Sequence, residues 1–430
     1  MTTSAPAQLL RFDFPPQLLT ILRRLADAGF EAYVVGGSVR DILLGKAPQD
    51  FDIATSARAE AVMRLFRRVV PTGLKHGTVL VIQGELKAEV TTFRGEGDYL
   101  DGRHPESVVF LDDVEGDLAR RDFTINAMAY DPVRQRFADP FDGRLDLTRH
   151  LVRCVGSALD RFSEDGLRVL RAVRFATTLG LDIEPETMAA IAPTLSTFDK
   201  VSRERQRDEF VKLLESAHPS RGIELLKESG ILSRLLPELS ESAIDDARLR
   251  LDRLLDAKSD ASLELRLSAL LADLAPAQLF GRVAQKTQAT ALLRRLRFSN
   301  AELDAVQKRL ARREFALMEH ATDAALRRAV SSVTPELVPD LLLLARALGA
   351  DREREEALRT HIDAVLSTNP PLAIVDLAID GDRVAAILGK GGPAIGLALN
   401  RLLDAVLDEP ALNTPEALEA ILCTGQEGAP

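Results

Sequence analysis

The chain has 430 residues, of which 46% are hydrophobic and 28% charged, a composition that excludes an intrinsically disordered protein and allows two to four domains. The N-terminus has no basic stretch leading into an apolar core, and no apolar run reaches transmembrane length, so we expect a cytoplasmic protein without membrane contact. The two cysteines, Cys154 and Cys423, are far apart in sequence. This spacing excludes a disulfide framework or a cysteine-based zinc site, and we expect both to fill core positions.

The net charge of −10 argues against a nucleic-acid partner, because binding to phosphates usually requires a basic surplus. One segment, in contrast, has more basic than acidic residues. Between Arg282 and Arg313 there are nine basic residues and two acidic ones, a surplus of seven. The segment could follow an RNA backbone, or it could form two amphipathic helices with solvated charges.

Up to about residue 150, short β-prone runs alternate with helical patterns, which predicts a small α/β domain. We expect strands at Ala32–Val35, Thr78–Gln83, Lys87–Phe93 and Ser107–Leu111, and helices at Pro16–Ala28, Val39–Leu44 and Ala57–Phe66. After Leu151 the strand signals nearly vanish and helical periodicity continues almost to the C-terminus. The expected fold class is therefore α+β, with an α/β head followed by all-α domains.

The segment VVGGSVRDILLG joins the first of these strands to a helix. The strand ends at Gly36 and Gly37, and Ser38 is predicted to cap the helix. Free N–H groups at the helix start, together with the helix dipole, suit a phosphate. The planar, permanently charged Arg40 could bind phosphate oxygens, and Gly45 is predicted to end the helix.

Two aspartates follow in the segment DFDIAT. If this segment is a strand, Asp50 and Asp52 project from the same face, and two hard oxygen ligands suit Mg²⁺. The alternative is an exposed pair of solvated acids. Glu89, in the alternating strand KAEVTTFR, is a candidate third carboxylate, although it could equally be a surface residue on an edge strand.

Together, GGSVRDILLG and DFDIAT resemble the signature of the class II tRNA nucleotidyltransferases and bacterial poly(A) polymerases. The resemblance implies a catalytic nucleotidyltransferase head (1–150), a helical neck that selects the base (151–218), a helical body (219–300) and a tRNA-binding helical tail (301–430). It further implies Mg²⁺-dependent addition of C, C and A, from CTP and ATP, to the 3′ end of tRNA without a nucleic-acid template. The sequence does not indicate protein partners or an oligomeric state.

The segment ARRDFTINA resembles the second motif of the family. Arg121 would meet a phosphate or the ribose. Asp122 and Asn126 could organise the site by hydrogen bonds, or they could be an N-cap and a buried, satisfied polar group.

A helix predicted across 161–175 carries RFSEDGLRVLRAVRF. Asp165, Arg168, Arg171 and Arg174 recur every three residues and would form one polar ridge, which could also be a set of exposed ion pairs. The family selects its base with an E-D-x-x-R motif, so Asp165 and Arg168 would read the base edge and Arg171 and Arg174 would reach the triphosphate.

Two positions depart from the family pattern. Gly166 stands where the family usually has proline, and we expect it to loosen the start of the helix. His104 stands where the family more often has arginine, within TFRGEGDYLDGRHP, which is predicted to be a mobile loop that helps the family change from C to A addition. The loop has the full length, which argues against an enzyme that adds only CC.

Two further segments carry weaker signals. In SRERQRDEF, Ser202 is a predicted N-cap, and Arg203, Arg205 and Arg207 form a basic edge best explained by solvated helix charges. The segment GKGGPAIG (389–396) precedes a helix predicted to begin near Pro393, which could offer N–H groups to a tRNA phosphate or be a structural helix start.

Several alternatives share the head. The segment VPTGLKHGTV resembles the CCA-adding form, which disfavours a poly(A) polymerase, but nothing in the sequence argues against an enzyme that adds only A. A catalytically silent helical RNA-binding scaffold is the non-enzymatic alternative, and it predicts that the acids are dispensable. None of the six histidines is followed by aspartate, so we expect no accessory phosphohydrolase activity.

Overall fold

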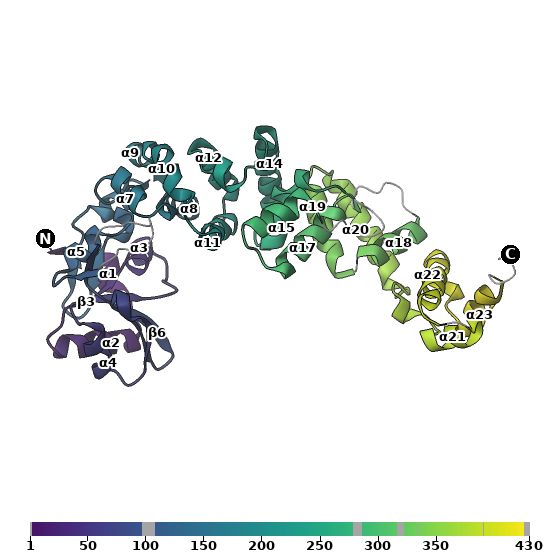
Figure 1. The fold of residues 1–430 in the computed structure, drawn as a ribbon, viewed down its shortest axis with the longest axis horizontal. Coiled ribbons are helices and arrows are strands. Elements are labelled where there is room, and N and C mark those ends of the chain that lie inside the picture. Colours follow the sequence, from purple (N-terminus) through teal and green to yellow (C-terminus); the bar gives the residue numbers. More distant parts are fainter. Residues whose placement is uncertain are drawn as a thin grey trace. The chain divides into compact units, whose positions relative to one another are not determined.

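The structure is a computed structural model that describes residues 2–96, 108–277, 286–315, 322–333, 335–389 and 391–424 (Figure 1). It divides into two compact units, 1–237 and 238–430, at the turn predicted near Pro237. The finer division into head, neck, body and tail stays a prediction. Within the described ranges, no helix combines the length and the apolar character that a membrane span requires.

A mixed eight-stranded sheet organises the described part of the first 150 residues. Its order is β1 (Thr2–Ser4), β10 (Arg136–Ala138), β9 (Ala129–Asp131), β2 (Ala32–Val35), β3 (Asp52–Thr55), β6 (Leu86–Thr92), β5 (Thr78–Gln83) and β4 (Val69–Gly73). Strands β3 and β6 are parallel, and the other neighbours are antiparallel. Separate two-stranded pairs are β7 (Arg94–Glu96) with β8 (Val108–Phe110) and β11 (Leu151–Val152) with β12 (Asp182–Ile183). The predicted α/β head is confirmed.

Helices cover both faces of this sheet, so the whole of β2 is buried and reads as a continuous apolar run. On one face lie α2 (Pro16–Asp27) and α4 (Ala59–Leu65), which contact β5 and β6 (Figure 1). Helix α2 buries Leu18, Ile21, Leu22 and Leu25, the spacing of an amphipathic helix. The remaining head helices are α1 (Ala7–Arg11), α3 (Gly37–Leu43), α5 (Val114–Ala119) and α6 (Gly143–Thr148).

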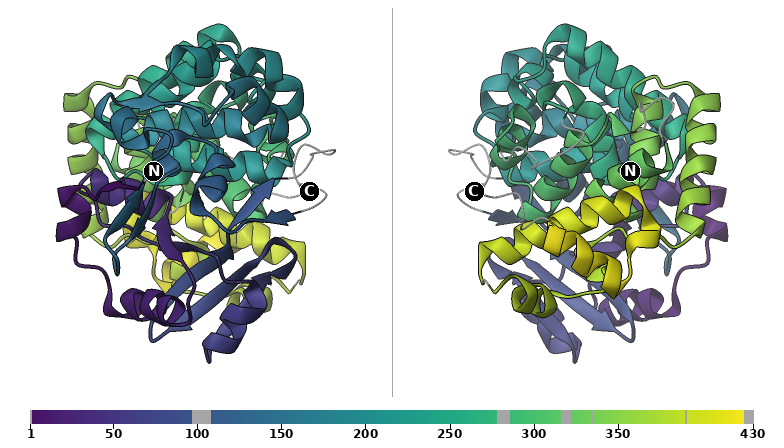
Figure 2. Two further views of the ribbon diagram at one scale, coloured as in Figure 1. Left: turned by 90° about the vertical axis from the view of Figure 1, so that its left-hand side faces the viewer. Right: turned by 90° about the vertical axis from the view of Figure 1, so that its right-hand side faces the viewer.

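The rest of the first unit is helical, apart from the short pair β11–β12. Its helices are α7 (Ala158–Glu164), α8 (Leu167–Leu179), α9 (Pro185–Ala189), α10 (Ile191–Phe198), α11 (Arg203–Leu214), α12 (Pro219–Glu228) and α13 (Leu232–Leu235). In Figure 1 and in the left view of Figure 2, the teal helices of this segment lie together beside the blue strands of the head. Helix α8 is the centre of this group, because it contacts α7, α10, α11 and α12.

The second unit consists of helices and short 3₁₀ turns in its described ranges. The helices are α14 (Glu241–Ala257), α15 (Leu263–Leu270), α16 (Gln288–Arg295), α17 (Asn300–Ala311), α18 (Asp323–Val333), α19 (Val338–Ala347), α20 (Arg352–Ser367), α21 (Gly381–Leu388), α22 (Pro393–Asp408) and α23 (Pro415–Thr424). The last three, yellow in the right view of Figure 2, share a core around Val384, Leu402 and Leu418. Helix α22 begins at Pro393, as predicted.

The two cysteines differ in solvent exposure. Cys154 is buried in the first unit, and burial raises the pKa of its thiol to about 12. Cys423 is exposed on α23, so the expectation that it fills a core was wrong. Its neighbour Leu422 takes the buried position on that helix instead.

The single helix predicted across 161–175 is two helices, because the chain leaves the helical conformation at Asp165 (φ −140°, ψ 106°). The Asp165 carboxylate accepts the backbone N–H of Leu167 at 3.0 Å, a local bond that competes with continuation of the helix. Helix α8 then starts after Gly166.

Gly166 is in tight contact with the end of α10. A Cβ at this position would lie 2.3 Å from the carbonyl carbon of Thr197 and 2.4 Å from the backbone nitrogen of Phe198. Backbone atoms cannot yield as a flexible side chain can, so only glycine fits here. The loosened helix start expected from the sequence is therefore not what the structure shows: the missing side chain lets α8 begin directly against α10.

Gly166→Ala is expected to destabilise the first unit by about 1–3 kcal/mol, because the added methyl group forces α8 and α10 apart. The measurement is thermal unfolding, in which we expect the midpoint to fall by on the order of 5 °C. Gly396→Ala is the control, since a Cβ at that position in α22 would meet nothing within 4 Å. An unchanged midpoint for Gly166→Ala would show that the close approach to α10 is unimportant.

Candidate active site

A pocket of about 550 Å³ lies in the first unit, where the sheet meets α3 and α8. Ten of the twelve predicted site residues line it: Gly36, Gly37, Arg40, Asp52, Glu89, Arg121, Asp165, Arg168, Arg171 and Arg174. Asp50 and Ser38 do not. The fold thus brings residues from five separate stretches of sequence into one cavity.

Asp52 and Glu89 are direct neighbours in register on the parallel strands β3 and β6. Because β6 lies between β3 and β5, Glu89 is not on an edge strand, and the prediction that it sits beside the aspartate strand is confirmed. The Asp52 carboxylate faces the pocket, yet surrounding protein partly desolvates it, which raises its pKa. The charges of Glu89 and Asp50 raise the pKa further, while Arg121 opposes them.

Asp50 itself lies outside the strand that was predicted to hold it. Strand β3 begins at Asp52, and Asp50 is exposed in the preceding loop. In the described ranges, no three side chains among His, Cys, Asp and Glu form a cluster of the kind that holds a metal ion. The structure therefore supplies the pair Asp52 and Glu89 as wall residues, with Asp50 close enough to act on Asp52 through its charge.

Ser38 does not cap α3, so that prediction was wrong. The N-cap is Gly36, at φ 72°, and the Ser38 hydroxyl donates to the carbonyl of Val35 at 3.1 Å from within the first turn. A Cβ on Gly36 would lie 2.8 Å from a terminal nitrogen of Arg121. The positive φ favours glycine at position 36, and any side chain there would also displace the end of the Arg121 side chain. Gly45, at φ 72°, follows the last residues of α3 as predicted.

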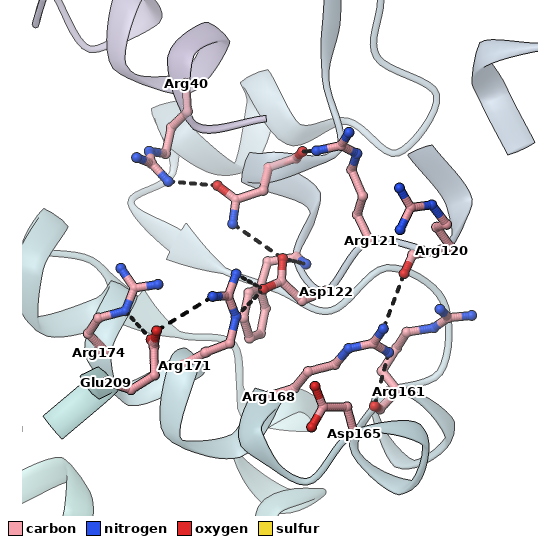
Figure 3. Close-up of polar contacts among 12 residues, drawn as sticks. Arg40, Arg120, Arg121, Asp122, Arg161, Asp165, Arg168, Arg171, Arg174 and Glu209 are labelled. Atoms are coloured by element: carbon pink, nitrogen blue, oxygen red, sulfur yellow. Dashed lines mark hydrogen bonds and ion pairs between the residues drawn. The ribbon is translucent and has the colours of Figure 1, made fainter. Parts of the chain in front are cut away.

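A chain of hydrogen bonds links α3 to α8 through the second motif (Figure 3). Arg40 donates to Asn126 Oδ1 at 2.7 Å, and Asn126 Nδ2 donates to Asp122 Oδ1 at 3.3 Å. Arg171 closes the chain with a fork to Asp122 Oδ2, Nε at 2.7 Å and a terminal nitrogen at 2.6 Å. Asp122 and Asn126 are therefore buried, satisfied groups that also organise the site.

The charges along α8 are balanced by buried acids. Burial alone would raise the pKa of Asp122, but the charge and hydrogen bond of Arg171 hold it at about 2. Arg174 Nε donates to Glu209 at 2.6 Å, and Arg171 lies 3.7 Å from the same carboxylate (Figure 3). These arginines likewise keep the pKa of Glu209 below its usual value, although burial opposes them.

Asp165 and Arg168 both line the pocket but pair with different partners. Asp165 accepts a fork from Arg205 on α11, at 2.7 and 3.3 Å. Arg168 is buried and donates to Glu164 and to the backbone carbonyls of Arg161 and Arg120. Each of the two side chains is thus held in one orientation at the pocket wall.

Two residues of the site were not singled out from the sequence, and one was given the wrong environment. Arg205 was expected to be a solvated helix charge, yet it lines the pocket, whereas Arg207 binds the neighbouring Asp208. Ser202 is the N-cap of α11 as predicted, although its side chain makes no capping hydrogen bond. Glu209 and Phe175 were also missed. The spacing of Arg171 and Phe175, four residues apart on one helix, is a signal that could have found the latter.

The basic segment 282–313 offers less free charge than its composition indicates. Arg295 pairs with Glu238 at 2.8 Å and Arg309 with Asp340 at 2.6 Å, and both acids lie outside the segment. Lys308 pairs with Asp304. Arg282 lies outside the described residues. The surplus of seven therefore overstates the cationic surface that an RNA backbone would meet.

Two more predictions fall partly on residues that the structure does not describe. In the loop 92–105, Thr92 ends β6 and Arg94–Glu96 form β7, while residues 97–105, His104 among them, are outside the described ranges. In the segment 389–396, Lys390 is also outside them. The role of each segment stays a prediction.

Comparison with known proteins places this site in a family. Residues 32–153 match the poly A polymerase head domain, and residues 180–242 match a probable RNA- and SrmB-binding site of polymerase A. The CCA-adding enzyme of Streptococcus gordonii is 35% identical over 94% of this chain and 96% of its own length. That of Lactococcus lactis is 47% identical over 53% of this chain, a match that spans 58% of the relative.

A comparison with solved structures indicates the same family. The Bacillus stearothermophilus CCA-adding enzyme in complex with CTP has a TM-score of 0.77 and 32% identity, and the match covers 96% of this chain and 98% of the other. The head sheet is that of a nucleotidyltransferase. The chain belongs to the family of the class II tRNA nucleotidyltransferases and bacterial poly(A) polymerases, within which these relatives are CCA-adding enzymes.

The pair Asp122–Arg171 predicts a defined loss of stability in acid. The pKa of folded Asp122 is about 2, against 3.8 for an ordinary aspartate, so the pair stabilises the protein above about pH 4 and this contribution is lost as the pH falls toward 2. The unfolding free energy of the wild type minus that of Asp122→Asn should therefore shrink by roughly 2 kcal/mol over this interval. Urea unfolding at several pH values measures it. A difference that stays constant between pH 2 and pH 6 would contradict the assignment.

Proposed function

We propose that this protein adds C, C and A, from CTP and ATP, to the 3′ end of tRNA, and that the protein itself selects each nucleotide. The observation that carries the proposal is the pocket. Its walls carry three groups: a carboxylate pair on the head sheet, arginines suited to phosphate, and an acid–arginine pair suited to a base edge. Reaction chemistry and base selection would then occur within one cavity of the first unit.

The acidic side chains on and beside the head sheet fit a divalent cation, because aspartate and glutamate oxygens are the ligands that Mg²⁺ prefers. Asp50 and Asp52 would hold it, with Glu89 as the candidate third carboxylate. When bound, Mg²⁺ would favour ionisation of the tRNA 3′ hydroxyl and stabilise negative charge on the phosphate oxygens. The register of β3 and β6 supports Asp52 and Glu89 more strongly than it supports Asp50, which lies in the loop.

The arginines would bind and orient the triphosphate. Arg40 and Arg121 come from the head, and Arg171 and Arg174 from α8, so the phosphates would be gripped from two sides. A guanidinium presents fixed N–H donors that match phosphate oxygens, and stabilisation of the transferred phosphoryl group is largely electrostatic. Loss of pyrophosphate would follow attack by the 3′ hydroxyl on the α-phosphate.

Asp165 and Arg168 would select the base. A carboxylate accepts from the exocyclic amine of cytosine or adenine, and a guanidinium donates to the acceptors beside that amine. Uracil and guanine present the opposite pattern at the corresponding positions, so they would leave the pair unsatisfied. Arg205 and the Leu167 backbone N–H both donate to Asp165 Oδ1, whereas Asp165 Oδ2 accepts one bond, from Arg205, and keeps a lone pair for this purpose.

Enzymes that add only A or only CC, and poly(A) polymerases, remain alternatives because they share this head. The non-enzymatic alternative, a helical RNA-binding scaffold, does not explain why two carboxylates and several arginines converge on one pocket. We further propose that the protein works in the cytoplasm, where tRNA and nucleoside triphosphates are available.

The test supplies tRNA ending before CCA, after C or after CC, with CTP and ATP, and sequences the products. Completion of CCA on all three substrates is expected. Products that stop after CC, extension of only the CC-ending tRNA, or long A tails would each identify one of the other family activities. No incorporation on any substrate would end the enzyme proposal.

Asp52→Asn should lower incorporation by roughly a hundredfold or more, because the metal would lose a charged ligand beside the reacting phosphate. Asp50→Asn is expected to have the smaller effect, since Asp50 does not line the pocket. Asp27→Asn, at the exposed end of α2, is the control. Labelled CTP and tRNA measure the rate at several Mg²⁺ concentrations. Undiminished incorporation by Asp52→Asn would overturn the assignment.

Arg205→Ala should weaken base selection while leaving transfer intact, because Asp165 would lose the partner that fixes its orientation. We expect the preference for CTP over UTP, expressed as a ratio of kcat/KM, to fall about tenfold, the value of a charge-assisted hydrogen bond. Arg207→Ala is the matched control on the same helix. Equal preferences in the two variants would show that Arg205 has no part in selection.

A further inference from the structure

We propose that Phe175 is a positioning residue whose ring face holds the triphosphate-binding arginines in place without using their hydrogen-bond donors. The inference rests on the proposed function, since it concerns how the pocket would bind the phosphates. It assigns a task to a side chain that has no polar group and that sequence motifs do not single out.

Three guanidinium groups of the pocket meet this one ring. The guanidinium carbon of Arg174 lies 3.6 Å from the ring centroid, that of Arg171 5.2 Å and that of Arg40 5.3 Å. Phe175 is 5% exposed and lines the pocket. The ring is fixed from behind by Phe123, edge to face, with centroids 5.7 Å apart. Because Arg40 comes from α3 and the other two from α8, the ring lies where the head and the helical segment meet within the first unit.

The geometry of the guanidinium group explains why a ring face can hold it without using its N–H donors. Its N–H donors all lie in one plane, and an acid that holds the group occupies some of them. An aromatic face attracts the cation through the ring quadrupole and uses none of them. Among the contacts of the described residues, Arg174 donates only through Nε, to Glu209, so its terminal nitrogens keep their donors for a phosphate.

The ring also stabilises the three arginines without changing the net charge of the pocket. Three cations that converge on one pocket repel each other. Asp41 pairs with Arg40, Asp122 with Arg171, and Glu209 with both Arg174 and Arg171. Additional acids would lower the repulsion but would also cancel the positive charge that the triphosphate needs. An aromatic face stabilises the cations without adding net charge, so the pocket stays positive.

The first experiment compares Phe175→Leu with Phe162→Leu. Both variants replace a buried ring by a large apolar side chain, but Phe162, on α7, does not line the pocket, whereas the ring of Phe175 lies against three guanidinium groups. We expect Phe175→Leu to raise the KM for CTP and ATP, and the inhibition constant of inorganic tripolyphosphate, by roughly threefold to tenfold, with a smaller change in kcat. Equal effects of the two variants on tripolyphosphate inhibition would overturn the inference.

The second experiment keeps the shape of the side chain and changes only its electrostatics. Phenylalanines with one, two or three fluorine atoms are incorporated at position 175, and tripolyphosphate binding to the full chain is measured by calorimetry without tRNA. Affinity should fall step by step with fluorination, because each fluorine weakens the quadrupole of the ring. The same series at position 162, a buried ring that does not line the pocket, should show no such trend. A flat series at position 175 would overturn the inference whether or not Phe175→Leu folds.

The two experiments separate this inference from the proposed function. A flat fluorine series in a protein that completes CCA would overturn the role of Phe175 alone. A graded series in a protein that transfers no nucleotide would support the role of Phe175 and end the proposed reaction. Wild-type protein that completes CCA but fails to bind tripolyphosphate would overturn the inference and leave the proposed function standing.

Discussion

The site depends on one electrostatic constraint: several arginines must face the same cavity while each keeps donors for a ligand. Buried carboxylates make this possible. Asp122 holds Arg171 and Glu209 holds Arg174, and both acids remain ionised because the arginines lower their pKa values against the effect of burial. The acids come from the head and from α11, so the same contacts that balance the charges also fasten helix α8 between the two. The arginine-lined wall of the pocket therefore depends on the same contacts that hold α8 against the head and α11.

Close backbone packing sets the remaining geometry. Gly36 ends β2 at a positive φ and leaves room for Arg121, and Gly166 allows α8 to start against the backbone of α10. Neither position could carry a side chain without moving a wall of the pocket. The register of β3 against β6 then places Asp52 next to Glu89, and this adjacency cannot be read from sequence because thirty-six residues separate them. Carboxylates and arginines thus reach one cavity through backbone constraints in the turn after β2, at the start of α8 and in the register of β3 against β6.

Much of the fold follows from local patterns. The buried run Ala32–Val35 and the amphipathic helix from Pro16 were predicted within a residue, because a strand covered on both faces and a helix with one apolar stripe leave plain periodicities. The short strands β9 and β10 were missed, since three residues are too few to show any period. The helix predicted through Asp165 was wrong for a different reason. Its charge spacing was helical, but the Asp165 side chain bonds to the backbone two residues on and interrupts the helix.

The sequence by itself determined the class of chemistry: a glycine turn, a spaced pair of aspartates and an arginine-rich helix indicated nucleotidyl transfer and named most of the residues that line the pocket. Those signals are local, because a turn, a strand end and one face of a helix each lie within a few consecutive residues. Only the tertiary structure decided which charges are held and which face the cavity. It set Arg205 against Asp165, Glu209 against Arg174 and the ring of Phe175 beneath three cations. Arg205 and Glu209 come from α11 and Arg40 from α3, so packing between separate helices fixes these partners and no sequence spacing records them, whereas Arg171 and Arg174 share α8 with Phe175.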